Sequence, residues 1–102
     1  MFPFRKRPDI NAGMVLYHNT KPALLLDVRT EEEYAQGHIE QSVNLPLARI
    51  EEAPNIFFDR EVPIFVYCRS GARSETAVSR LKGMGYVNVT NIGGIIYYRN
   101  FD

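Results

Sequence analysis

Short apolar runs that end in polar residues are the feature that most limits how this chain can fold. Residues 23–28 (A-L-L-L-D-V) and 64–67 (I-F-V-Y) lack the regular polar alternation of a half-exposed strand. Runs of this length are typical of strands covered on both faces, as in a parallel sheet. A third strand is predicted over residues 87–92 (V-N-V-T-N-I), just before Gly93 and Gly94.

Helix signals fall between these runs. Thr30 followed by Glu33 is a capping box, and the acids at 31–33 suit the positive end of a helix dipole. A helix is therefore predicted from Thr30, ending at Gly37. A second helix is predicted over residues 72–84, where apolar residues recur at helical spacing: Ala77, Val78, Leu81 and Met84. Strands alternating with helices predict an α/β fold, with a mainly parallel sheet flanked by helices on both faces.

Three weaker signals complete the expected elements. Asn11 is expected to cap a short helix that runs through Tyr17. Residues 42–45 are expected to form a short strand. Residues 47–52 are expected to form one or two helical turns that stop before Pro54.

The length of 102 residues suits one domain, with residues 1–9 as an N-terminal arm and residues 10–102 as the folded unit. Cys68 is the only cysteine, which excludes an internal disulfide and any site that needs several thiolates. No metal and no other cofactor is expected. An unpaired cysteine fits a reducing compartment, so we expect a cytoplasmic protein.

The charge balance limits the partners. Lys and Arg together equal Asp and Glu, so the formal net charge is zero. A general nucleic-acid binder would carry a basic excess, so no nucleic-acid partner is expected. No apolar run approaches the ~20 residues that a membrane-spanning helix needs, so no membrane association is expected either.

The stretch from Cys68 to Ser74 (C-R-S-G-A-R-S) carries the clearest chemical signal. Cys68 follows a predicted buried strand and precedes a predicted helix, which is where open α/β folds bind ligands. A short loop around Gly71 can turn successive N–H groups inward and form an anion-binding nest at the helix start. Such donors would stabilise a thiolate, and Arg69 and Arg73 add positive charge that can hold an anionic substrate.

A lone cysteine is more often a small buried hydrophobe than a nucleophile. That interpretation places Cys68 beside Arg, Ser and Gly, which are poor company in an apolar core. Catalytic cysteines occupy electropositive, partly exposed loops, and this segment has that composition. We therefore predict that Cys68 is a catalytic nucleophile.

Five motifs in order along the chain resemble those of the rhodanese domain family, the sulfurtransferases. Each motif alone is a weak signal, but five in the family's order form a specific pattern. The matching segments are Asp27-Val28-Arg29, Glu33-Tyr34 with Gly37-His38-Ile39, Val43-Asn44-Leu45-Pro46, the Cys68–Ser74 loop, and Gly93-Gly94 followed by an aromatic residue. The chain departs from the pattern at Gln41-Ser42, where the family has small residues, and at Tyr98, where it usually has Trp.

The resemblance implies a parallel sheet flanked by helices and a persulfide mechanism. Cys68 would take the outer sulfur of a donor such as thiosulfate, and a thiol or cyanide would then remove it; a protein acceptor is a further option. The substrate-binding residues would be Arg69, Ser70, Gly71, Ala72, Arg73 and Ser74, with both arginines holding the donor's sulfonate end.

Three further residues near the site are expected to be structural. Asp27 and Arg29 are interpreted as a buried polar pair that fixes the strand end. His38 could act as a base, but an amide nest removes the need for one, so a structural role in the G-H-I turn is preferred.

Two other functions stay open at this level. A Cys-dependent phosphatase or arsenate reductase shares the fold, but its loop has one residue more between Cys and Arg than the four found here. A non-catalytic rhodanese-like binding module would typically lack the cysteine. A persulfide carrier that relays sulfur between proteins would have the same loop as a turnover enzyme, so the sequence does not separate those two.

Overall fold

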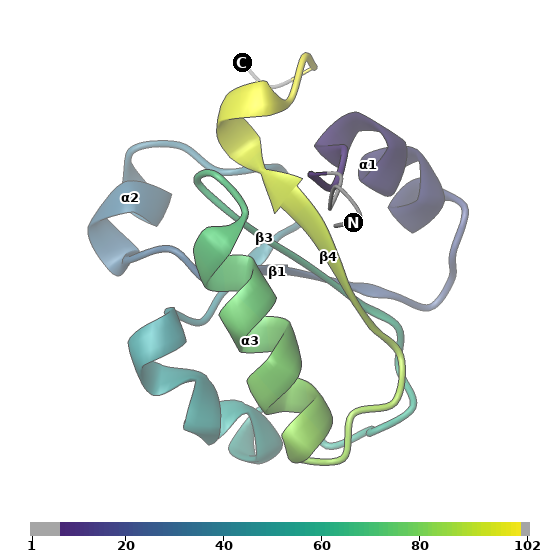
Figure 1. The fold of residues 1–102 in the computed structure, drawn as a ribbon. Helices are drawn as coiled ribbons and strands as arrows, with labels where there is room; N and C mark the ends of the chain where they lie inside the picture. The colour runs from purple at the N-terminus through teal and green to yellow at the C-terminus, as the bar shows by residue number, and fades with distance from the viewer. Residues whose placement is uncertain (1–6, 101–102) are drawn as a thin grey trace, which may run out of the picture.

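Within the described part of the chain, residues 7–100, four parallel strands form one sheet (Figure 1). Their order across the sheet is β2 (Val43–Asn44), β1 (Leu24–Asp27), β3 (Ile64–Cys68) and β4 (Val89–Gly94). The predicted arm over residues 1–9 lies mostly outside the described residues of this computed structural model. The elements in chain order are α1 (Ile10–His18), β1 (Leu24–Asp27), α2 (Glu31–Ala35), β2 (Val43–Asn44), the 3-10 helix η1 (Leu47–Asn55), β3 (Ile64–Cys68), α3 (Ala72–Gly83), β4 (Val89–Gly94) and the 3-10 helix η2 (Ile95–Tyr97). The predicted α/β class with a parallel sheet is confirmed.

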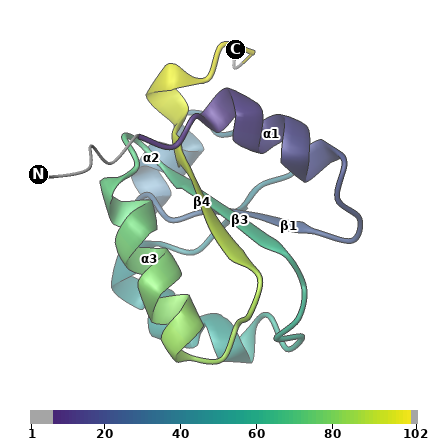
Figure 2. The same ribbon diagram turned by 45° about the vertical axis from the view of Figure 1, so that its right-hand side comes forward.

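Both faces of the sheet are covered, which explains the continuous apolar runs. Every residue of β3 is buried, and its side chains alternate between two cores. Val66 and Cys68 belong to the core under α3 and η1, whereas Phe65 and Tyr67 belong to the core under α1. Figure 2 shows α1 and α3 on opposite sides of the strands. A strand between two cores needs apolar side chains at every position, because neither face meets water.

The two predicted helix caps have different outcomes. The capping box at Thr30 is present in both directions, as predicted. The expected cap at Asn11 is wrong: Asp9 is the N-cap of α1, and its carboxylate accepts from the Asn11 backbone N–H at 2.9 Å. Asp and Asn are nearly equal caps, so the chain could begin the helix at either. Starting the helix two residues earlier places Ile10, which is buried, at its first position.

Two further predicted boundaries are shifted. The turns after Leu47 extend through Pro54 to Asn55 instead of stopping before the proline. A proline is tolerated there because a short 3-10 segment leaves few backbone bonds to break. The last strand is Val89–Gly94, so it includes both glycines, and its register to β3 shifts by one residue between Val66 and Tyr67.

The carboxyl ends of the three longer strands meet at one edge of the sheet. Cys68 at the end of β3 lies opposite Gly94 at the end of β4, and Tyr67 lies opposite Asp27 at the end of β1. The segments that follow these ends therefore converge around Cys68.

Candidate active site

Cys68 lies at the end of the central strand β3, with the start of α3 wrapped around its sulfur. The Gly71 backbone N–H donates to Sγ at 3.0 Å and the Ser74 N–H donates at 3.4 Å. The Ser74 hydroxyl oxygen lies 3.5 Å from Sγ. These donors come from residues three and six positions beyond Cys68. The loop is thus an anion nest around the sulfur of the kind that the sequence predicts.

Competing influences act on the ionisation of Cys68. Burial of the thiol, the largest of them, raises its pKa. The hydrogen bond with the Ser74 side chain, together with those from the amides of Ser74, Gly71 and Ser70, lowers the pKa by more. The pKa of Cys68 therefore lies below its ordinary value. A depressed pKa makes the thiolate, which is the nucleophilic form, more abundant at neutral pH.

The thiol is more enclosed than the partly exposed loop that we expected. Arg69, Ser70 and Ala72 are exposed, but Cys68 itself is only 1% exposed. The reason is its place at the end of the central strand, between the ends of β1 and β4.

Glycines on two segments permit the loop conformation. Gly71, the N-cap of α3, has φ +109°, a region that favours glycine. On β4, a Cβ at Gly94 would lie 2.6 Å from the Ser70 Cα and would also collide with the Arg69 carbonyl oxygen. The loop backbone therefore lies directly on the β4 backbone, which explains the Gly-Gly sequence better than flexibility does.

Asn91, on β4, holds the residues that contact the sulfur, and sequence reasoning missed it. Its Nδ2 donates to the Gly71 carbonyl at 3.3 Å, and its Oδ1 accepts from the Ser74 hydroxyl at 2.7 Å and from the Gly93 N–H at 2.9 Å. The signal that could have found it is its place as a polar residue directly before Ile92 and the Gly93-Gly94 motif.

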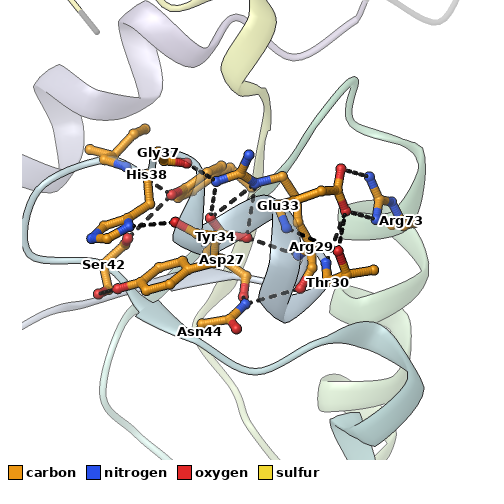
Figure 3. Close-up of polar contacts among 12 residues, drawn as sticks. Asp27, Arg29, Thr30, Glu33, Tyr34, Gly37, His38, Ser42, Asn44 and Arg73 are labelled. Atoms are coloured by element: carbon orange, nitrogen blue, oxygen red, sulfur yellow. Dashed lines mark hydrogen bonds and ion pairs between the residues drawn. The ribbon is translucent and has the colours of Figure 1, made fainter. Parts of the chain in front are cut away.

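Arg73 and Arg69 differ in a way that the sequence did not reveal. The Arg73 guanidinium forms a two-pronged ion pair with Glu33, with distances of 2.7 and 3.0 Å (Figure 3). Arg69 is exposed and has no carboxylate within ion-pairing distance in the described part of the chain. Arg73 is therefore already paired, and Arg69 is the cation available to a ligand.

Asp27 and Arg29 form the buried pair that we expected. Arg29 Nη2 lies 2.7 Å from Asp27 Oδ2 and donates at the same distance to the Gly37 carbonyl, so the pair links β1 to the turn after α2 (Figure 3). Asn44 adds donors to the carbonyls of both residues at 3.0 Å. This network fixes the end of the strand beside β3.

His38 lies apart from the sulfur contacts. Its exposed ring stacks on Tyr34, with ring centroids 3.7 Å apart, and Nδ1 lies 2.8 Å from the Tyr34 carbonyl oxygen (Figure 3). No contact joins it to the Cys68 loop. The geometry gives it a place in the turn after α2, in keeping with the structural role that we preferred.

A cavity of about 480 Å³ opens at this edge of the sheet. Arg69 from the loop, Arg29 and Glu33 supply charged groups to its wall. Ile95, Ile96 and Tyr98 supply apolar surface. A volume of this size holds a small organic molecule.

Metal-ligand clusters and membrane-spanning helices are both absent from the described residues. Between residues 7 and 100, no cluster of three or more His, Cys, Asp or Glu side chains is arranged to hold a metal ion. No helix in the same range is long and apolar enough to cross a membrane.

Most of the chain is similar to known proteins. The model of the Rhodanese-like domain family matches residues 14–97. A sulfurtransferase of Allochromatium vinosum is 46% identical over 83 residues, which cover 76% of this chain and 73% of that protein. The thiosulfate sulfurtransferase PspE of Escherichia coli is 37% identical over 71 residues, which cover 69% of this chain and 68% of that protein.

A solved structure of a rhodanese with anions from E. coli has a TM-score of 0.70 and 33% identity, covering 76% of this chain and 92% of that one. Two fungal relatives, from Schizosaccharomyces pombe and Ogataea parapolymorpha, are longer, and the chain spans 61% and 18% of their lengths.

Proposed function

Because the chain belongs to the rhodanese-like domain family, we propose that it is a sulfurtransferase that carries sulfane sulfur on Cys68. The observation that carries the proposal is the nest of donors on the Cys68 sulfur, with Gly71 N–H at 3.0 Å and Ser74 N–H at 3.4 Å. These fixed donors would stabilise negative charge on the sulfur before and after transfer without rearranging during the reaction.

The first half-reaction loads the cysteine. The Cys68 thiolate attacks the outer sulfur of a donor such as thiosulfate. The sulfur–sulfur bond of the donor breaks, its electron pair leaves with sulfite, and Cys68 becomes a persulfide anion. Arg69, which has no carboxylate partner among the described residues, would hold the oxygen end of the donor. The relative PspE, a thiosulfate sulfurtransferase by name, supports this class of donor.

The second half-reaction unloads the cysteine. A nucleophile such as cyanide, a small thiolate or a protein thiol attacks the outer sulfur, and the electron pair of the breaking bond returns to Cys68. With cyanide the product is thiocyanate. Neither step needs a metal or a redox cofactor, because each is a nucleophilic displacement at sulfur in which the electron pair of the broken bond stays with the leaving group.

A chain with one cysteine also suits a reducing compartment such as the cytoplasm.

Intact mass measurement tests the proposal. After incubation with thiosulfate, the wild-type chain should gain the mass of one sulfur atom, and cyanide should remove it with release of thiocyanate. Cys68→Ala is the control and should gain nothing. If several sulfane donors all leave the wild-type mass unchanged, the proposal is wrong.

The phosphatase alternative is tested with the same variants. The shorter loop, with four residues between Cys68 and Arg73, favours a sulfur atom over a tetrahedral phosphate. We therefore expect no hydrolysis of an aryl phosphate. Hydrolysis by wild type that disappears in Cys68→Ala would reverse the preference.

A further inference from the structure

The two arginines of the Cys68 loop are in different electrostatic states. Arg73 is held by both oxygens of Glu33, whereas Arg69 is exposed and has no ion pair in the described part of the chain. Arg29, which also lines the cavity, is neutralised by Asp27 at 2.7 Å. Arg73 does not line the cavity itself but is paired with Glu33, which does. Among the described residues that line the cavity, Arg69 is therefore the one cation without a carboxylate partner.

The Glu33 carboxylate is fixed in place by more than Arg73. It accepts from the Thr30 backbone N–H at 2.9 Å and from the Thr30 hydroxyl at 3.1 Å, as the capping box of α2. Its hydrogen bonds, chiefly those from Arg73, lower its pKa to about 2. Glu33 is therefore ionised at neutral pH and holds Arg73 there, while facing the cavity itself.

We propose that Glu33 determines which sulfur donors the site accepts, by neutralising Arg73 and so selecting donors with one negative charge over dianionic thiosulfate. The inference rests on the proposed sulfurtransferase function. A dianion that enters a partly buried site must exchange its water shell for compensating charge, and here one free guanidinium meets it. A second negative charge in the cavity would also meet the Glu33 carboxylate on its wall.

The apolar part of the cavity indicates the rest of the donor. Ile95, Ile96 and Tyr98 line it together with the charged residues, and its volume of about 480 Å³ exceeds what a small inorganic ion needs. The chemical class that fits is an organic sulfane donor with an apolar body and a single charge, such as an organic thiosulfonate. Its reaction is balanced: the Cys68 thiolate takes the outer sulfur, and an organic sulfinate leaves with the electron pair.

A double-mutant cycle with two donors tests the inference. The rate constant of sulfur loading on Cys68 is measured by intact mass with thiosulfate and with benzenethiosulfonate, at fixed ionic strength. The ratio of the two rate constants is compared between variants, so that differences in intrinsic donor reactivity cancel. Glu33→Gln removes the charge but keeps a capping-box residue, because Gln also serves at this position.

The ratio of the two loading rate constants should follow the net charge that residues 33 and 73 contribute together. Glu33→Gln frees Arg73 and should raise the thiosulfate-to-thiosulfonate ratio by about tenfold, the order expected for one close charge in a partly buried site. Arg73→Ala leaves Glu33 unpaired and should lower the ratio by a similar factor. The double variant should return close to the wild-type ratio. Glu32→Gln, an exposed neighbour on α2, removes the same net charge and should not change it.

The outcomes separate the two claims. Loading that proceeds with an unchanged ratio in Glu33→Gln and Arg73→Ala would overturn this inference and leave the sulfurtransferase proposal standing. A lower rate with both donors in every variant would show that Glu33 is only structural, and would also overturn it. If Glu33→Gln does not fold, Arg73→Ala alone still tests the inference, because its ratio should fall below the wild-type ratio. No sulfur on Cys68 with either donor would remove the proposed function and this inference together.

Discussion

Ser74→Ala isolates one donor of the nest around Cys68. The Ser74 side chain is fully buried and its hydroxyl oxygen lies 3.5 Å from Sγ. Among the groups that lower the pKa of Cys68, this hydroxyl is the strongest. The backbone N–H groups of Gly71 and Ser74 remain in the variant. The substitution therefore removes the hydroxyl contact with the sulfur, and with it the hydrogen bond to Asn91 Oδ1, while both backbone donors stay in place.

The expected magnitude follows from the geometry. A distance of 3.5 Å is long, and the same hydroxyl has a better acceptor in Asn91 Oδ1 at 2.7 Å. The hydrogen bond to the thiolate should therefore contribute about 1 kcal/mol, at the low end for a charged partner. Losing it should raise the pKa of Cys68, because the thiolate is then less stabilised. At any pH below both pKa values, the thiolate fraction should fall about fivefold.

The pH dependence of Cys68 alkylation by iodoacetamide, followed by intact mass, measures the pKa directly. Ser79→Ala makes the same change on the same helix at an exposed position, and it should leave the alkylation profile unchanged. An unchanged or lowered pKa in Ser74→Ala would refute the reasoning, because the backbone alone would then hold the thiolate.

Four further predictions concern other positions. Asn91→Ala removes the side chain that holds Gly71 and Ser74. It should slow sulfur loading about fivefold, the effect of weakening the donors to the sulfur by about 1 kcal/mol. An unchanged loading rate, measured by intact mass, would contradict the role. Gly94→Ala should lower the free energy of unfolding by about 1–3 kcal/mol in urea titrations, because its Cβ meets loop backbone. Gly83 lies in a helix with nothing within 4 Å of an added Cβ. Gly83→Ala should therefore raise the free energy of unfolding by about 0.5–1 kcal/mol. The contribution of Glu33 to stability, present above its usual pKa of 4.5 because folding lowers that pKa to about 2, should be lost as pH falls between these values. In urea titrations at several pH values, the free energy of unfolding of Glu33→Gln should therefore fall less steeply at acidic pH than that of the wild type. An equally steep fall in both proteins would contradict the pairing.

The parts of the fold that local sequence encodes were predictable. The capping box at Thr30 needs only residues within one helical turn, and the apolar run of β3 needs only its own composition. The Cys68 loop was predictable for the same reason, since both sulfur-contacting amides lie within six positions of the cysteine.

The contacts between residues far apart in the sequence were not predictable. Glu33 and Arg73 are 40 positions apart, and the role of Glu33 in the capping box already explained its presence. Asn91 reaches the loop only because β4 pairs with β3 through an irregular register. The choice between Asp9 and Asn11 as a cap was decided by burial of Ile10, which is a tertiary contact.

The parallel pairing of β3 with both neighbours has a consequence for the order of folding. The amides that contact the Cys68 sulfur come from the following turn, so they can assemble when α3 forms. The enclosure of the thiol depends on β1 and β4, whose partner residues are distant in sequence, and such non-local pairing is slow. During refolding, Cys68 should therefore stay open to alkylation until these strands dock. The same side chain that is proposed to carry sulfur would then report when the sheet is complete.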